Sequence, residues 1–280
     1  MNTLCIAGLL LLVVGASAWA DGIDDFNQGL AAGNHGDNDE AISLLSRALS
    51  EGSLAPDLQA TALVDRGAAY LRQGKYAQAA ADYGAAVRLK PQYFDALAGR
   101  AQAFAATGNK ADALTDCQTL TKRWPNDASS YTICGRLDWE MGNYSEAATN
   151  LETALEFNPR NPYAFLWLCL AVFHSNSEPK SHLHQLAGAV DAEDWPSPLI
   201  DLYLGDGSFE SAQRAARDDP TNRNRPCELG FYGGEWQLLQ GNAAAGRALL
   251  KQAADLCPET YIETEPARSE LRRLGDGAIQ

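Results

Sequence analysis

The feature that most constrains the fold of this chain is a step of 34 residues. A glycine, an alanine and a proline each recur at this step. The three series are Gly74, Gly108 and Gly142, then Ala79, Ala113 and Ala147, then Pro91, Pro125 and Pro159. The glycine ends a helix and lets the chain reverse, the alanine lets two helices approach closely, and the proline stops the second helix. Each period therefore encodes a pair of antiparallel helices, and successive pairs stack.

One period, residues 60–93, carries nine residues at fixed offsets that resemble the consensus of the tetratricopeptide repeat. They are Leu63, Gly67, Tyr70, Gly74, Tyr76, Ala79, Tyr83, Ala86 and Pro91. The resemblance implies an all-α fold, in which helix-turn-helix units form a solenoid that winds as a right-handed superhelix.

Further copies divide most of the remaining chain. The predicted N-terminal array covers residues 22–161 as the copies 22–55, 60–93, 94–127 and 128–161, and a C-terminal copy covers 227–260. The period fails over residues 162–226, which we interpret as a degenerate helical segment that bends the solenoid or begins a second lobe. An irregular insertion is the alternative. Residues 261–275 are expected to contain a polar-faced capping helix that Gly275 ends.

The first twenty residues have the pattern of a signal peptide. Leu4 to Val14 form an apolar run, and Ala18-Trp19-Ala20 provides the small residues of a cleavage site. We expect cleavage after Ala20 and export to the periplasm. The alternative is an uncleaved N-terminus that associates with the membrane. Because Cys5 precedes the apolar run instead of following it, no lipid anchor is expected.

The charge of the chain excludes some classes of partner. Lys and Arg number 22 against 36 Asp and Glu, which gives a net charge of −14. Nucleic acids and anionic lipids reward clustered Lys and Arg, so this chain is not expected to bind either of them. Protein or peptide segments are the expected partners.

A set of later motifs resembles the NlpI family of envelope tetratricopeptide proteins. The motifs are Asn161-Pro162-Tyr163, Leu166-Trp167-Leu168, Leu170-Ala171, Trp195, Tyr203-Leu204-Gly205, Phe231-Tyr232 with Gly234, Glu263, Ala267, Glu270-Leu271 and Leu274-Gly275. This resemblance implies a homodimeric periplasmic adaptor that holds cell-wall hydrolases and brings them to a tail-specific protease. The alternative function is a scaffold of a secretion, pilus or polysaccharide-export assembly.

The resemblance to tetratricopeptide repeats also implies where a partner binds. In such superhelices the first helix of each repeat lines a concave groove, here through Val64, Leu71, Arg72, Gln102, Arg136, Trp139, Tyr163, Leu166 and Phe173. The set is apolar and aromatic with two arginines, which favours an apolar or helical peptide as ligand. Trp139 is the main anchor candidate. The alternative is that Trp139 packs on the helix that begins at Tyr163 and is only structural.

Two cysteine pairs are candidates for disulfides in an oxidising compartment. Cys227 opens the first helix of its repeat and Cys257 closes the antiparallel second helix, so their ends should lie side by side. Cys117 and Cys134 lie at matching heights on neighbouring helices. Unpaired thiols are the alternative for both pairs. Cys169 lies within an apolar helix and is expected to pack as a small hydrophobe.

Neither catalysis nor a cofactor is expected from the sequence. His182 and His184 lie two residues apart and point away from one another on a helix, so they cannot chelate a metal from one turn. No cysteine has a histidine near it in the sequence that would activate the thiol as a nucleophile. We therefore predict a binding protein that is not an enzyme and holds no metal.

Overall fold

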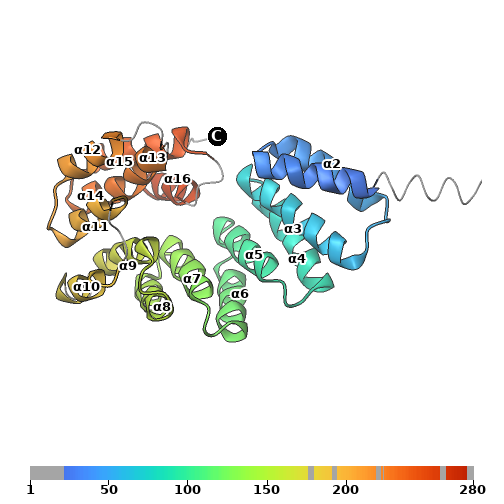
Figure 1. The fold of residues 1–280 in the computed structure, drawn as a ribbon, viewed down its shortest axis with the longest axis horizontal. Coiled ribbons are helices and arrows are strands. Elements are labelled where there is room, and N and C mark those ends of the chain that lie inside the picture. The colour runs from blue at the N-terminus through green and yellow to red at the C-terminus, as the bar shows by residue number, and fades with distance from the viewer. Residues whose placement is uncertain are drawn as a thin grey trace, which may run out of the picture. The chain divides into compact units, whose positions relative to one another are not determined.

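A computed structural model describes residues 22–175, 180–190, 194–218, 222, 224–258 and 263–275. In this part of the chain every regular element is a helix, which confirms the predicted all-α class (Figure 1). The predicted signal peptide, residues 1–20, lies outside the described residues. The chain divides into two compact units, and the division falls between Asp116 and Cys117, within helix α6 (Lys110–Arg123).

Unit 1 consists of successive helix pairs. A helix over residues 22–35 pairs with α2 (Asn38–Ser50), α3 (Pro56–Arg72) pairs with α4 (Tyr76–Leu89), and α5 (Phe94–Ala106) precedes α6. The helices α3 and α4 pack on one another, and α4 packs in turn on α5. The stacking of successive hairpins therefore follows the 34-residue step.

The turn between the two helices of a pair depends on glycine. Gly74 has φ +69° and Gly108 has φ +76°, a left-handed conformation that a side chain disfavours. Beyond each glycine a backbone N–H returns to the end of the first helix: Lys75 donates to the Tyr70 carbonyl at 2.8 Å and Asn109 to the Phe104 carbonyl at 2.9 Å. These bonds satisfy carbonyls that would otherwise remain open at the helix end.

Each hairpin of unit 1 is also joined by an ion pair. Arg66 on α3 binds both carboxylate oxygens of Asp82 on α4 at 2.7 Å. One repeat later, Arg100 on α5 binds Asp116 on α6 in the same two-pronged way, at 2.6 and 2.8 Å. A bidentate pair fixes the orientation of the two helices as well as their separation.

Unit 2 contains the remaining helices. Their bounds are α7 (Ala128–Glu140), α8 (Tyr144–Phe157), α9 (Pro162–Ser175), α10 (Lys180–Ala187), α11 (Ser197–Leu204), α12 (Phe209–Asp218), α13 (Asn224–Glu228), η1 (Leu229–Gly233), α14 (Gly234–Leu239), α15 (Ala243–Leu256) and α16 (Thr264–Arg273). Where the period fails, α10, α11 and α12 are short helices.

The core of unit 2 is built around α9, which is apolar on nearly all sides. Trp167, Phe165 and Leu166 on this helix are fully buried. A helix that is hydrophobic all round needs neighbours all round, and α9 packs on α7, α8, α10, α11 and α14. One buried polar group of this core, the Tyr203 hydroxyl, donates to the Tyr232 carbonyl at 2.7 Å.

The last repeat departs from regular helix geometry. Its first helix is continuous from α13 through η1, a π-helical turn, into α14, and its second helix is α15. A Cβ on Gly234 would lie 3.0 Å from Leu250 and 3.2 Å from the Gly246 carbonyl, so the glycine allows α14 and α15 to approach closely. The last helix, α16, packs on α15. Both helices have the orange to red colours of the C-terminal part of the chain in Figure 1.

Candidate functional site

The first helices of the hairpins in unit 1 carry four of the expected binding residues. Leu71 and Arg72 on α3 and Gln102 on α5 are partly exposed, whereas Val64 on α3 is buried. Three of the four residues are therefore accessible on the face where the sequence places the groove. The assignment of these residues to a partner-binding face stays a prediction.

Arg72 is held in place by the preceding hairpin. Its Nε donates to the Asn38 side chain at 2.7 Å. Next to it, the Gln73 amide donates to the Asp39 carboxylate at 2.8 Å. These bonds fix the C-terminal end of α3 against the start of α2. Burial raises the pKa of Asp65, and the Arg72 charge opposes this shift.

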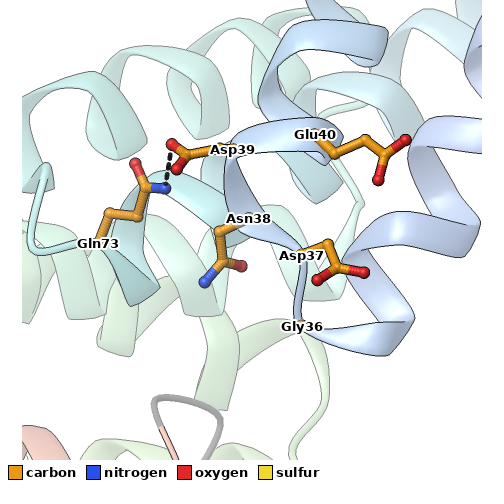
Figure 2. A pocket seen from close by; sticks show the side chains of 6 residues that line it. All are labelled: Gly36, Asp37, Asn38, Asp39, Glu40 and Gln73. Carbon is orange, nitrogen blue, oxygen red and sulfur yellow. Dashed lines mark hydrogen bonds between the residues drawn. The ribbon is translucent and has the colours of Figure 1, made fainter.

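A hollow of about 410 Å³ lies beside this junction, and Figure 2 shows its lining. Gln73 faces the start of α2 across it, and carboxylates of the α2 N-terminus surround it. The lining residues are Gly36, Asp37, Asn38, Asp39, Glu40 and Gln73. Carboxylates at a helix N-terminus stabilise that helix through its dipole, which is sufficient reason for their position.

In unit 2, three of the expected groove residues are not accessible, which corrects the prediction for them. Trp139 is 3% exposed, Arg136 is 7% exposed, and Leu166 is fully buried. The reason is packing on both sides: α9 lies in the centre of the unit, and α16 contacts α7. Tyr163 and Phe173 are partly exposed. The Tyr163 hydroxyl nevertheless donates to Glu228 at 3.0 Å, and the Phe173 ring packs 5.8 Å from that of Tyr203.

Trp139 belongs to an aromatic cluster. Its ring meets Trp167 at a centroid distance of 5.3 Å and Phe231 at 5.9 Å, both edge to face. It also contacts His174 at 5.5 Å. Edge-to-face contacts at these distances are the preferred packing of aromatic cores. These contacts favour the alternative interpretation, in which Trp139 of α7 is a structural residue that packs on α9.

Sequence reasoning missed a group of buried carboxylates in unit 2. Glu228 accepts from the Trp195 indole at 2.6 Å, Tyr232 donates to Glu263 at 3.3 Å, and His174 pairs with Glu235 at 3.0 Å. All three glutamates are at most 5% exposed. A signal was present, because positions 228, 232 and 235 share one face of a helix whose sequence is otherwise apolar.

Burial raises the pKa of each of these acids. For Glu228, the Trp195 and Tyr163 hydrogen bonds oppose the shift, and for Glu235 the His174 hydrogen bond does so. For Glu263, burial together with the facing Glu228 charge raises the pKa to about 7. These groups cluster at the contact between η1, α14 and the C-terminal residues, which makes that contact sensitive to ionisation.

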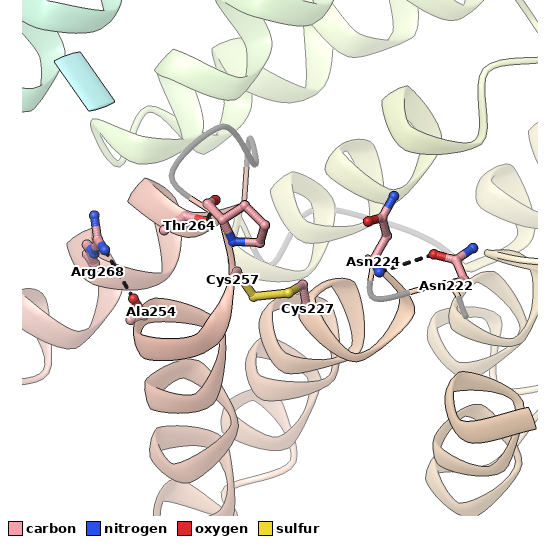
Figure 3. The surroundings of a disulfide bond; sticks show 8 residues. Asn222, Asn224, Cys227, Ala254, Cys257, Thr264 and Arg268 are labelled. Atoms are coloured by element: carbon pink, nitrogen blue, oxygen red, sulfur yellow. Dashed lines mark hydrogen bonds between the residues drawn. A yellow bond between two sulfur atoms is a disulfide. The ribbon is translucent and has the colours of Figure 1, made fainter. Parts of the chain in front are cut away.

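The cysteines of unit 2 have two different states. Cys227 and Cys257 form a disulfide with their Cα atoms 5.5 Å apart, at the junction of the two antiparallel helices (Figure 3). Cys117 and Cys134 are buried free thiols, which is the unpaired alternative for this candidate pair. Cys169 is fully buried, consistent with packing as a small hydrophobe.

The histidines lie beside single acids. His182 pairs with Glu152 at 3.1 Å, and His184 with Asp206 at 3.3 Å. Across the described ranges, no three His, Cys, Asp or Glu side chains are grouped so that they could hold a metal ion. The same residues include no helix that is both long and apolar enough to cross a bilayer.

Comparison with solved structures shows the same fold. A tetratricopeptide repeat protein from Parabacteroides merdae matches 90% of this chain and 98% of its own length, with a TM-score of 0.58 at 19% identity. The C-terminal part of a repeat-containing protein from Cytophaga hutchinsonii matches 86% of this chain and 98% of its own length, with a TM-score of 0.53 at 13% identity. At these identities the likeness concerns the fold alone.

The family is shown by the sequence. The tetratricopeptide repeat model matches residues 26–73, 64–128 and 135–181, which together make up more than half of the chain. The matches cover the hairpins of unit 1 and extend through α7, α8 and α9 of unit 2. The helix pairs, their glycine turns and the family match agree, and the chain belongs to the tetratricopeptide repeat family.

Proposed function

We propose that this protein is an exported scaffold that binds protein segments in the bacterial envelope and has a role similar to that of the NlpI family. Tetratricopeptide repeats generally serve as surfaces for protein–protein interaction. The observation that carries the proposal is the accessible face of α3 and α5, where Leu71, Arg72 and Gln102 combine one apolar and two polar side chains. The scaffold performs no catalysis of its own.

The ligand on this face is an apolar or helical peptide segment. Around Gln102, helix α5 is rich in alanine, with Ala98, Ala105 and Ala106 among its residues. Short side chains let a second helix approach closely, and Leu71 provides an apolar contact beside them. Arg72, oriented by Asn38, offers a fixed charge at the end of the face.

The envelope location is supported by two independent features. The Cys227–Cys257 disulfide is typical of proteins that fold in an oxidising compartment. The apolar run Leu4 to Val14 with Ala18 and Ala20 is typical of a signal peptide, and we propose cleavage after Ala20 without a lipid anchor. N-terminal sequencing of the protein from its producing cells tests this: Asp21 as the first residue is expected, and a chain that still begins at Met1 contradicts it.

The proposed partners are cell-wall hydrolases and a processing protease, which a homodimer of the scaffold brings together. Affinity capture of the tagged protein from the envelope fraction, followed by mass spectrometry, tests this assignment. Enrichment of a murein hydrolase or a tail-specific protease is the expected result. Enrichment of secretion, pilus or polysaccharide-export components instead would contradict it. Light scattering of the purified chain gives the oligomeric state, and a monomeric mass would contradict the homodimer.

A further inference from the structure

The C-terminal residues 263–275, here called the α16 segment, dock on unit 2 through a buried surface. Ala267 and Leu271 are at most 1% exposed, and the segment contacts α15, α7 and η1. Two bonds join it to α15: Arg247 donates to the Leu274 carbonyl at 2.7 Å, and Arg268 donates to the Ala254 carbonyl at 3.2 Å. The Arg268 bond is drawn in Figure 3.

The polar side of this contact contains a buried carboxyl group. Glu263 is 2% exposed, and the Tyr232 hydroxyl of η1 donates to it at 3.3 Å. Burial and the charge of the buried Glu228 raise the pKa of Glu263. An ionised carboxylate at this place raises the free energy of the docked segment, because a charge is poorly solvated and like charges repel strongly where water is excluded.

The positively charged side chains at this contact already bind other acids. Arg136 binds Glu140 and also faces Glu263, while Arg272 and Arg273 bind Glu265 and Glu270 within α16 itself. On α15, Lys251 pairs with Asp255 instead of with the segment.

The remaining groups that face these acids provide incomplete compensation. His174 of α9 pairs with Oε2 of Glu235, and Oε1 of Glu235 is buried without a hydrogen-bond partner. Tyr144 on α8 provides no charge, because burial raises the pKa of its phenol above the ordinary value. Tyr163 and Trp195 hydrogen-bond Glu228, and Arg225 lies near it. An ionised carboxylate with an open buried oxygen is costly, and a proton on one acid of a facing pair removes the repulsion.

We propose that docking of the α16 segment is linked to a proton on Glu263: the segment stays docked while this buried carboxyl holds a proton, and it separates when the carboxyl ionises. Separation uncovers the face of α7 that α16 contacts. The proposal concerns a movement of this chain alone and does not depend on the proposed partners.

The direction of the pH dependence follows from the buried acids. Burial raises the pKa of Glu140, Glu228 and Glu235, and it raises that of Glu263 from 4.5 to about 7. The docked state therefore binds more protons than the open state. Its stability is fully present below the open-state pKa near 4.5 and is lost as the pH rises through the docked-state pKa near 7.

Hydrogen–deuterium exchange of the full-length protein tests the proposal at pH 5 and pH 8, with rates corrected for the intrinsic pH dependence of exchange. Amides of α16 are compared with those of α8, a helix of the same unit. We expect the protection of α16 to fall by roughly 70-fold from pH 5 to pH 8, as a single group shifted from 4.5 to about 7 requires. The protection of α8 should stay constant.

Two variants separate ionisation from simple loss of structure. Glu263→Gln keeps an acceptor for Tyr232 but cannot ionise, so α16 should remain protected at pH 8. Glu156→Gln makes the same change on the exposed surface of α8 and should behave as wild type. Protection of α16 that is unchanged between the two pH values, or lost equally in Glu263→Gln, overturns the proposal. A parallel loss in α8 also overturns it, because the whole unit would then be loosening.

Discussion

The ring of Tyr83 occupies the space that a Cβ on Gly99 would need. Tyr83 belongs to α4 and Gly99 to α5 of the next repeat, so the contact joins two hairpins of unit 1. Tyr83 also lies against Gly67 of its own repeat, where a Cβ would be 3.2 Å from the ring. One tyrosine between two glycines thus sets how closely successive hairpins stack.

The variant Gly99→Ala should destabilise the protein by about 1–3 kcal/mol, because an added methyl forces the buried Tyr83 ring and its helix to shift. Gly84→Ala is the matched control. A Cβ at Gly84 would meet only ordinary contacts at 3.7 Å or more, and alanine favours a helix interior by about 0.5–1 kcal/mol. Urea unfolding should therefore give opposite signs for the two variants, and equal effects would contradict this packing account.

The Arg100–Asp116 pair should contribute as a unit. Asp116→Asn leaves the Arg100 guanidinium without its carboxylate and should cost about 2 kcal/mol. Removing both charges in Arg100→Met with Asp116→Asn should cost less than the two single changes added together, by about 1 kcal/mol or more. A double-mutant cycle from urea unfolding measures this coupling. Additive single effects would show that the pair does not stabilise the hairpin.

The repeat pattern explains why much of the fold could be predicted from sequence. Gly74 and Gly108 turn in the left-handed region, and Ala79 and Ala113 are fully buried, because these positions admit few other residues. Such constraints are local and recur every 34 residues, so they are visible without a structure. Cys227 and Cys257 lie at the ends of the two helices of one repeat, so the local geometry of a single hairpin also brings them together.

The binding residues of unit 2 could not be predicted in this way. The period identifies Trp139 and Arg136 as positions on the first helix of a repeat, but it does not show what packs over that helix. The chain returns through α16 to contact α7 more than a hundred residues later. Contacts at this sequence separation depend on the irregular helices α10 to α14, which do not follow the repeat.

The disulfide gives a direct prediction about thiols. Titration of the denatured mature protein without reductant should find three free thiols per chain, those of Cys117, Cys134 and Cys169. Reduction should lower the free energy of unfolding by about 3–4 kcal/mol, since the bridge closes a span of 30 residues. Five free thiols would contradict the bridge, and one free thiol would show that Cys117 and Cys134 are also joined.

Trp139→Ala should act on stability. A buried ring with edge-to-face neighbours on α9 and η1 leaves a large cavity when it is removed, at a cost of about 3–5 kcal/mol. Thermal unfolding measures this loss, and Trp124→Ala, on a partly exposed tryptophan directly after α6, is the control with a smaller expected effect. If the Trp139→Ala protein has the same melting temperature as wild type, the ring is not part of the core.

The central claim is that the first helices of unit 1 bind a protein segment, and the most direct test is the affinity of a partner recovered by envelope capture. Calorimetry would compare wild type with Gln102→Arg on α5 and with Gln78→Arg, the same change on an exposed residue of the second helix α4. We predict that Gln102→Arg raises the Kd about 30-fold, or about 2 kcal/mol, while Gln78→Arg leaves it unchanged. Equal Kd values for all three proteins would contradict the claim.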